Sequence, residues 1–228
     1  MTTTTIERFS SGGQVVPLEV FLPAAALSRC KAVLMLHGSF GLLPPYRSDI
    51  VSFAQALAAR GVAAAMPHYL DATGTAPGVG VFALIAQHGP AWRQACSDAL
   101  ASMAKDARFD ASHLGILGFS LGANLALSLA MDPPAGTQLR CVVDFFGPTQ
   151  GLPAHWARLP PVLIFHGTDD RLVAPSESHH LVAQLESAGK KKGQGYVFES
   201  YQGQGHGFKG AALAKSRDET VEFVNKML

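Results

Sequence analysis

Short apolar runs alternate along the chain with longer segments in which apolar residues recur every three or four positions. The short runs are typical of strands covered on both faces, and the longer segments are typical of helices. Strands are predicted at residues 15–22, 32–36, 62–66, 114–117, 141–145, 162–165 and 197–201. Helices are predicted at residues 48–60, 90–105, 121–131, 175–188 and 211–226. This alternation predicts right-handed crossovers and one mainly parallel sheet with helices on both faces.

The ends of this pattern set the expected domain organisation. The first predicted strand has no helix before it, so we expect it to pair antiparallel at an edge of the sheet. Residues 1–13 are expected to form a frayed N-terminal segment. The longest irregular stretch, residues 68–89, follows a strand end and is expected to border a pocket. Strands and helices use nearly all of the 228 residues, which predicts a single domain over 1–228 without a cap domain.

The charge balance excludes several classes of partner. Eighteen Lys and Arg stand against 17 Asp and Glu, for a formal net charge of +1. We therefore expect no nucleic acid and no anionic membrane as partner, and a monomer or weak homo-oligomer. The three cysteines are widely spaced and form no CxxC pair, so neither a disulfide framework nor a metal site is expected. No signal peptide and no apolar run of about 18 residues is present, which favours a cytoplasmic protein.

The strongest chemical motif follows the predicted strand at 114–117. There the sequence Gly-Phe-Ser-Leu-Gly, residues 118–122, leads into an apolar helix. A serine on a sharp turn between strand and helix needs small neighbours, and such a turn exposes the Ser120 hydroxyl above the sheet. The N–H of Leu121 would then lie at a helix N-terminus, where it can stabilise an oxyanion. The structural alternative is a glycine-rich turn in which Ser120 only caps the helix.

A nucleophilic serine needs a base and a third group that orients the base. In a sheet of this type both are expected at later strand ends, in the order serine, acid, histidine. Asp169 and Asp170 lie in the turn after the strand at 162–165, and Asp170 is predicted as the acid while Asp169 caps the turn. His206 lies between glycines in the loop after the last strand, and it is the predicted base.

An early loop supplies the second predicted oxyanion donor. Residues 36–41, LHGSFG, follow a predicted strand, and the backbone N–H of Ser39 is the expected donor, with that of Phe40 as the alternative. Aromatic side chains close to the predicted strand ends could form an apolar substrate pocket. Phe40, Tyr69 and Phe119 are the predicted pocket residues.

Six sequence blocks in order resemble the dienelactone hydrolase family of the α/β-hydrolase superfamily. They are LHGSFG (36–41), PHYLDATGT (67–75), LGILGFSLGANLALSLA (114–130), CVVDFFG (141–147), HGTDDRLVAP (166–175) and YQGQGHGF (201–208). The resemblance implies a lidless α/β-hydrolase fold, hydrolysis of small esters or lactones without a cofactor, and a triad of Ser120, Asp170 and His206. The members that gave the family its name use a cysteine nucleophile and hold a substrate carboxylate with arginines. Here the nucleophile position carries Ser120, and Arg47, Arg93 and Arg171 lie near the predicted site loops.

The sequence therefore predicts a serine hydrolase that acts on small carboxylic esters or lactones through an acyl-enzyme, with water as second substrate. The same triad could cleave a thioester or a small amide. A binding protein that uses the pocket without turnover, or a purely structural role, are alternatives from other classes. A dinucleotide enzyme is excluded because no GxGxxG follows the first central strand and no GxxxxGK[ST] occurs.

Overall fold

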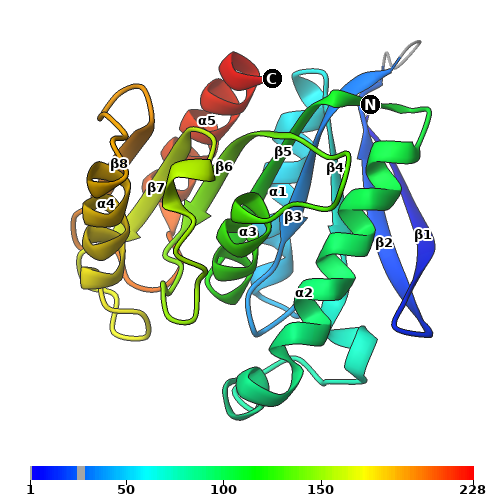
Figure 1. The fold of residues 1–228 in the computed structure, drawn as a ribbon, viewed down its shortest axis with the longest axis horizontal. Helices are drawn as coiled ribbons and strands as arrows, with labels where there is room; N and C mark the ends of the chain where they lie inside the picture. Colours follow the sequence, from blue (N-terminus) through cyan, green and yellow to red (C-terminus); the bar gives the residue numbers. More distant parts are fainter. Residues whose placement is uncertain (1, 25–28) are drawn as a thin grey trace.

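The computed structural model describes residues 2–24 and 29–228, which contain one eight-stranded sheet (Figure 1). Its strands are β1 (Thr3–Ser11), β2 (Gln14–Leu22), β3 (Cys30–Leu36), β4 (Val62–Pro67), β5 (Phe109–Phe119), β6 (Leu139–Phe145), β7 (Val162–Gly167) and β8 (Tyr196–Tyr201). They are ordered β1-β2-β4-β3-β5-β6-β7-β8 across the sheet. β1 and β2 pair antiparallel, as do β2 and β4, and all other pairs are parallel. The predicted mainly parallel sheet is confirmed.

Helices cover both faces of this sheet. They are α1 (Tyr46–Ala59), α2 (Val81–Lys105), α3 (Leu121–Met131), α4 (Ser176–Ser187) and α5 (Gly210–Met227), with short 3-10 helices η1 (Tyr69–Thr73) and η2 (Trp156–Arg158). Helices α2, α3 and α4 lie on one face, and α1 and α5 lie on the other (Figure 1). Side chains alternate between the faces along each strand. In β3, Leu34 and Leu36 join the core under α2–α4, while Val33 and Met35 join the core under α1 and α5.

The N-terminal segment differs from the prediction, because most of residues 1–13 form an edge strand and not a frayed end. β1 pairs with the whole of β2, from Thr3 opposite Leu22 to Ser11 opposite Gln14. The two strands are joined at Gly12 and Gly13, whose φ angles of 54° and 81° suit a tight hairpin turn. β2 corresponds to the first predicted strand. It pairs antiparallel as expected, but it lies second from the edge of the sheet because β1 forms the edge.

The stretch at 68–89 was also predicted wrongly as irregular. It contains η1 and the first nine of the 25 residues of α2, which begins at Val81 and continues through Pro90. The sequence predicts this helix only from Pro90, a residue type that is common in the first helical turn. In the structure Pro90 is exposed, where the missing N–H breaks no buried hydrogen bond. Among all helices of the described chain, none combines the length and apolarity of a membrane span.

Parallel strands end at the same edge of the sheet, and this edge positions the candidate site. The loops that follow β3, β5, β7 and β8 all emerge there, and they carry Ser39, Ser120, Asp170 and His206 respectively. In open α/β sheets this carboxyl edge is where ligands bind.

Candidate active site

The turn between β5 and α3 holds Ser120 in a conformation that few L-residues adopt. Its φ is 55° and its ψ is −120°, outside the allowed regions for a residue with a side chain. The neighbouring glycines allow this turn. A Cβ at Gly118 would lie 2.2 Å from the carbonyl oxygen of Gly122, and a Cβ at Gly122 would lie 2.3 Å from that of Leu36. Only glycine fits at either position, and the predicted strained turn is present.

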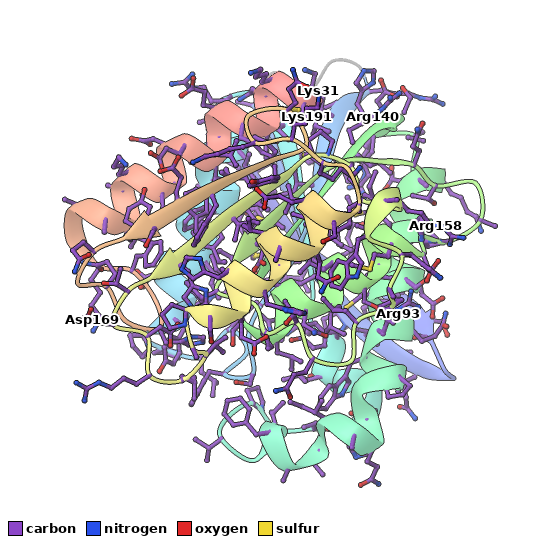
Figure 2. The ribbon with its side chains drawn as sticks, turned by 60° about the vertical axis from the view of Figure 1, so that its left-hand side comes forward. Lys31, Arg93, Arg140, Arg158, Asp169 and Lys191 are labelled. Carbon is purple, nitrogen blue, oxygen red and sulfur yellow. The ribbon has the colours of Figure 1, made fainter. Side chains whose placement is uncertain are left out.

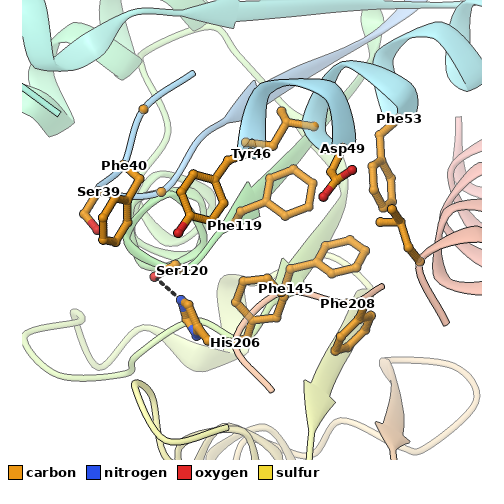
Figure 3. A pocket seen from close by; sticks show the side chains of 16 residues that line it. Ser39, Phe40, Tyr46, Asp49, Phe53, Phe119, Ser120, Phe145, His206 and Phe208 are labelled. Carbon is orange, nitrogen blue, oxygen red and sulfur yellow. Dashed lines mark hydrogen bonds between the residues drawn. The ribbon is translucent and has the colours of Figure 1, made fainter. Parts of the chain in front are cut away.

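Ser120, His206 and Asp170 are linked by hydrogen bonds, of which Figure 3 shows the one between Ser120 and His206. His206 Nε2 lies 2.9 Å from Ser120 Oγ, and His206 Nδ1 lies 2.7 Å from Asp170 Oδ2. The other carboxylate oxygen, Asp170 Oδ1, accepts hydrogen bonds from the backbone N–H groups of Leu172 at 2.9 Å and Val173 at 3.0 Å. The carboxylate is fully buried, whereas the His206 side chain is 20% exposed. The acid is therefore fixed, and the histidine faces the space where a substrate would enter.

A second histidine lies against the same carboxylate. His166 is buried, with Nδ1 2.6 Å from Ser178 Oγ and Nε2 3.0 Å from the carbonyl oxygen of Val173. Its Nε2 is also 3.5 Å from Asp170 Oδ2. Burial alone would raise the pKa of Asp170, but hydrogen bonds from His166 and His206 lower it below its ordinary value. Asp170 is therefore an anion at neutral pH.

The neighbouring carboxylate, Asp169, lies at the surface of the molecule (Figure 2). Its carboxylate accepts a hydrogen bond of 2.8 Å from the Thr168 hydroxyl, and the Thr168 hydroxyl oxygen accepts one of 2.8 Å from the N–H of Gly203. The N–H of Asp169 donates to the carbonyl of Gln204 at 2.9 Å. Asp169 thus holds this turn against the loop that carries His206, and it does not contact His206.

Asp144, at the end of β6, is a buried carboxyl group that the sequence analysis did not single out. Its Oδ1 accepts the N–H of Gly147 at 2.8 Å, and its Oδ2 has no partner among the residues the structure describes. Burial raises the pKa of Asp144 to about 6, although the Gly147 N–H and the nearby His166 oppose this rise. Asp144 is not among the residues that line the cavity described below.

Backbone donors are available beside Ser120. A Cβ on Gly38 would lie 3.3 Å from Ser120 Cβ, which places the loop after β3 directly against the serine. Ser39 is buried in this loop, and Leu121 is the first residue of α3. No hydrogen bond within residues 2–24 and 29–228 uses the N–H of Ser39, Phe40 or Leu121. These N–H groups therefore have no partner among the described residues.

A cavity of about 90 Å³ opens beside Ser120, and its walls are mainly aromatic (Figure 3). Phe40 and Phe119 line it as predicted. Tyr69 does not, and its prediction as a pocket residue is wrong. Tyr69 is fully buried below the loop, where its ring stacks on His37 at a centroid distance of 4.3 Å. Its hydroxyl donates to the carbonyl of His37 at 2.7 Å, so Tyr69 supports the loop from beneath.

Sequence analysis missed most of the cavity wall. The further lining side chains are Tyr46, Asp49, Ile50, Phe53, Phe145, Phe146, Phe208 and Leu213. Phe145 and Phe146 were in principle detectable, because they end a predicted strand at the carboxyl edge of the sheet. The lining residues of α1 were not detectable from the sequence. Helical periodicity shows which residues share a helix face, but it does not show that this face lies beside Ser120.

The model of the dienelactone hydrolase family matches residues 18–223 of this sequence. The chain belongs to the dienelactone hydrolase family. This membership places it in the α/β-hydrolase superfamily and supports a hydrolase activity. No curated protein sequence matches the chain.

Solved structures share the fold of this dienelactone hydrolase family member at low sequence identity. One from Klebsiella pneumoniae subsp. pneumoniae, provisionally assigned as a dienelactone hydrolase, has a TM-score of 0.81 at 18% identity and covers 99% of both chains. A dienelactone hydrolase-like promiscuous phosphotriesterase from metagenomic libraries has a TM-score of 0.80 at 19% identity, covering 99% of this chain and 98% of its own. A puromycin-hydrolysing peptidase from Mycobacterium tuberculosis has a TM-score of 0.81 at 18% identity, and this chain spans 39% of its length.

The three arginines considered for an anionic substrate lie outside the cavity of this family member. Arg47 forms two hydrogen bonds of 2.7 Å with the buried Glu19. Arg93 donates to Ser128 at 2.7 Å on the far side of α3 from the serine turn, and Arg171 is exposed (Figure 2 shows Arg93). Among the described residues that line the cavity, none is an arginine or lysine.

Proposed function

We propose that this protein is a serine hydrolase that cleaves small carboxylic esters or lactones through an acyl-enzyme. The observation that carries the proposal is the hydrogen-bonded chain from Asp170 through His206 to Ser120, which ends at an apolar cavity. A helix cap needs no such chain, because capping uses only the serine hydroxyl and backbone N–H groups. Moreover, Ser120 forms no side-chain cap hydrogen bond with α3.

The first half of the reaction transfers the acyl group to the enzyme. As Ser120 Oγ attacks the carbonyl carbon, His206 Nε2 accepts the hydroxyl proton, and Asp170 stabilises the imidazolium through Nδ1–H. The N–H groups of Leu121 and Ser39 stabilise the oxyanion of the tetrahedral intermediate. The intermediate then collapses, the carbon–oxygen bond to the alcohol breaks, and His206 gives its proton to the leaving oxygen.

The second half regenerates the enzyme with water. His206 accepts a proton from the water that attacks the acyl carbon, and it returns this proton to Ser120 Oγ as the acid leaves. One water is consumed and one acid and one alcohol are formed, or one hydroxy acid from a lactone. All groups in this scheme belong to the chain itself, and the substrates are a small molecule and water.

Two other activities would use the same groups. A thioester or a small amide follows the same steps with a sulfur or nitrogen leaving group. The amide alternative draws support from the puromycin-hydrolysing peptidase that shares the fold. A binding protein without turnover is disfavoured, because it would need neither the strained serine nor the buried carboxylate behind His206.

The test is a panel of p-nitrophenyl acetate, a small lactone, a short thioester and a small anilide, each assayed with wild type and Ser120→Ala. We expect the ester and lactone to have the highest kcat/KM and the variant to lose about 10³-fold or more. Preferred cleavage of the anilide would favour the amide alternative. Turnover of no substrate by a folded protein would contradict hydrolase function.

A further inference from the structure

One acidic side chain lies in the otherwise apolar part of the cavity wall. Asp49 is half-buried in the first turn of α1, and it lies between Tyr46 and Phe53 along the helix (Figure 3). Residues spaced by three and four positions share one helix face, so these three side chains are presented to the cavity together. Among the described residues, the Ser52 hydroxyl donates to the backbone carbonyl of Asp49 at 2.6 Å, and the Asp49 carboxylate itself accepts no hydrogen bond and forms no ion pair.

The negative charge of Asp49 is not neutralised by the protein. The nearest basic residue on the helix, Arg47, is held by Glu19 through two bonds of 2.7 Å. The described residues of the cavity wall contain no lysine or arginine side chain. A site for a substrate carboxylate would carry a cationic side chain, whereas this cavity carries a carboxylate.

Aromatic rings surround the space that this carboxylate faces. Phe40 and Tyr46 lie 5.1 Å apart between centroids, and Phe53 packs edge-on to Phe119 at 5.3 Å. The rings are tilted relative to one another, so the cavity is bounded by both ring faces and ring edges. Ring faces together with a carboxylate are the surroundings that an alkylated ammonium group prefers. A hydroxylated group such as a sugar would instead need several hydrogen-bonding partners, which aromatic walls do not offer.

We propose that the substrate carries a small alkylated ammonium group, which binds in this cavity beside Asp49 while its ester carbonyl lies at Ser120. Asp49 is then a specificity-determining residue that selects cationic over neutral esters. The cavity of about 90 Å³ suits a group of the size of trimethylammonium. This proposal rests on the proposed function, because it assigns the cavity as the substrate site of Ser120.

Direct binding of two isosteres tests the role of charge without requiring turnover. Choline and 3,3-dimethylbutan-1-ol have the same shape, but only choline is a cation. We expect wild type to bind choline about tenfold more tightly by isothermal titration calorimetry, as a partly desolvated cation–aromatic and charge contact implies. Asp49→Asn should lower this ratio several-fold, while the aromatic rings keep it above unity. Asp218→Asn removes the same charge from an exposed site on α5 and should keep the wild-type ratio.

Acetylcholine and 3,3-dimethylbutyl acetate extend the comparison to catalysis, with the same expected ratio in kcat/KM. Equal binding of the two alcohols by wild type, or an unchanged ratio in Asp49→Asn, would overturn the proposal. A lower melting temperature of Asp49→Asn with an unchanged ratio would show that Asp49 only stabilises α1. Charge-selective binding without reaction of Ser120 with a fluorophosphonate would contradict the proposed function and leave the cation site standing.

Discussion

Replacement of Asp170 by asparagine perturbs the proposed triad without removing the contacts that hold the turn. Asp170 Oδ1 accepts the N–H groups of Leu172 and Val173 at 2.9 and 3.0 Å, and the amide oxygen of asparagine can accept both. The amide NH₂ would then face His206 Nδ1, where the carboxylate oxygen now lies at 2.7 Å. An NH₂ donor there forces the ring proton onto Nε2, which faces Ser120. His206 could no longer accept the serine proton.

The expected loss in kcat is about 10³- to 10⁴-fold, which corresponds to about 4–5.5 kcal/mol of transition-state stabilisation. The assay is steady-state hydrolysis of a short p-nitrophenyl ester, with circular dichroism to verify the fold. Asp169→Asn is the matched control, because Asp169 is exposed and contacts Thr168 but not His206. We expect it to retain a rate close to wild type. A rate within tenfold of wild type for Asp170→Asn would refute Asp170 as the acid.

Two further predictions concern the residues around the triad. Gly122→Ala places a Cβ 2.3 Å from the carbonyl oxygen of Leu36, so urea unfolding should show a loss of about 3 kcal/mol, the upper end for overpacking. Gly89→Ala is the control, because a Cβ on Gly89 in α2 would lie 3.9 Å from its nearest neighbouring atom and should not destabilise the protein. Equal stabilities of the two variants would contradict the close packing described at the serine turn. Asp144→Asn should unfold at higher urea than wild type at pH 8, because burial raises the pKa of Asp144 to about 6 and ionisation above that pH costs stability. The rise in the pKa of Asp144 from its ordinary value corresponds to at most about 3 kcal/mol of lost stability at pH 8. The greater stability of Asp144→Asn should vanish below pH 4, where Asp144 is protonated in both the folded and the unfolded protein. A difference between the two proteins that does not change with pH would show that burial does not raise the pKa of Asp144.

Most central elements were predictable because buried parallel strands are apolar on successive residues, as in β3 and β7. β1 was missed because its side chains are mostly exposed, so Thr3–Ser11 carries no apolar pattern. The Gly12–Gly13 pair between two extended segments was the available indication of a hairpin. The start of α2 was missed for a similar reason, because its first two turns are largely exposed and Gly89 and Pro90 interrupt the helical pattern.

The hydrogen-bonded chain of Ser120, His206 and Asp170 was predictable because each residue follows a strand end and carries a local motif. The pocket was only partly predictable, because cavity walls depend on which helix face packs over the serine. Tyr69 follows the end of β4 and Phe119 is the last residue of β5. Tyr69 nevertheless lies under the loop, whereas Phe119 faces the cavity. Asp49 gave no indication at all, since an acid in the first turn of a helix is explained by the helix dipole alone.

The central claim is that Ser120 is an activated nucleophile. Its most direct test is the intact mass of the protein after treatment with a small fluorophosphonate, beside a Ser120→Ala control. We predict one adduct on the wild-type chain and none on the variant, because only a serine deprotonated by His206 reacts rapidly with the phosphorus centre. An unmodified wild-type chain with an intact fold, or an equal adduct on Ser120→Ala, would contradict the account.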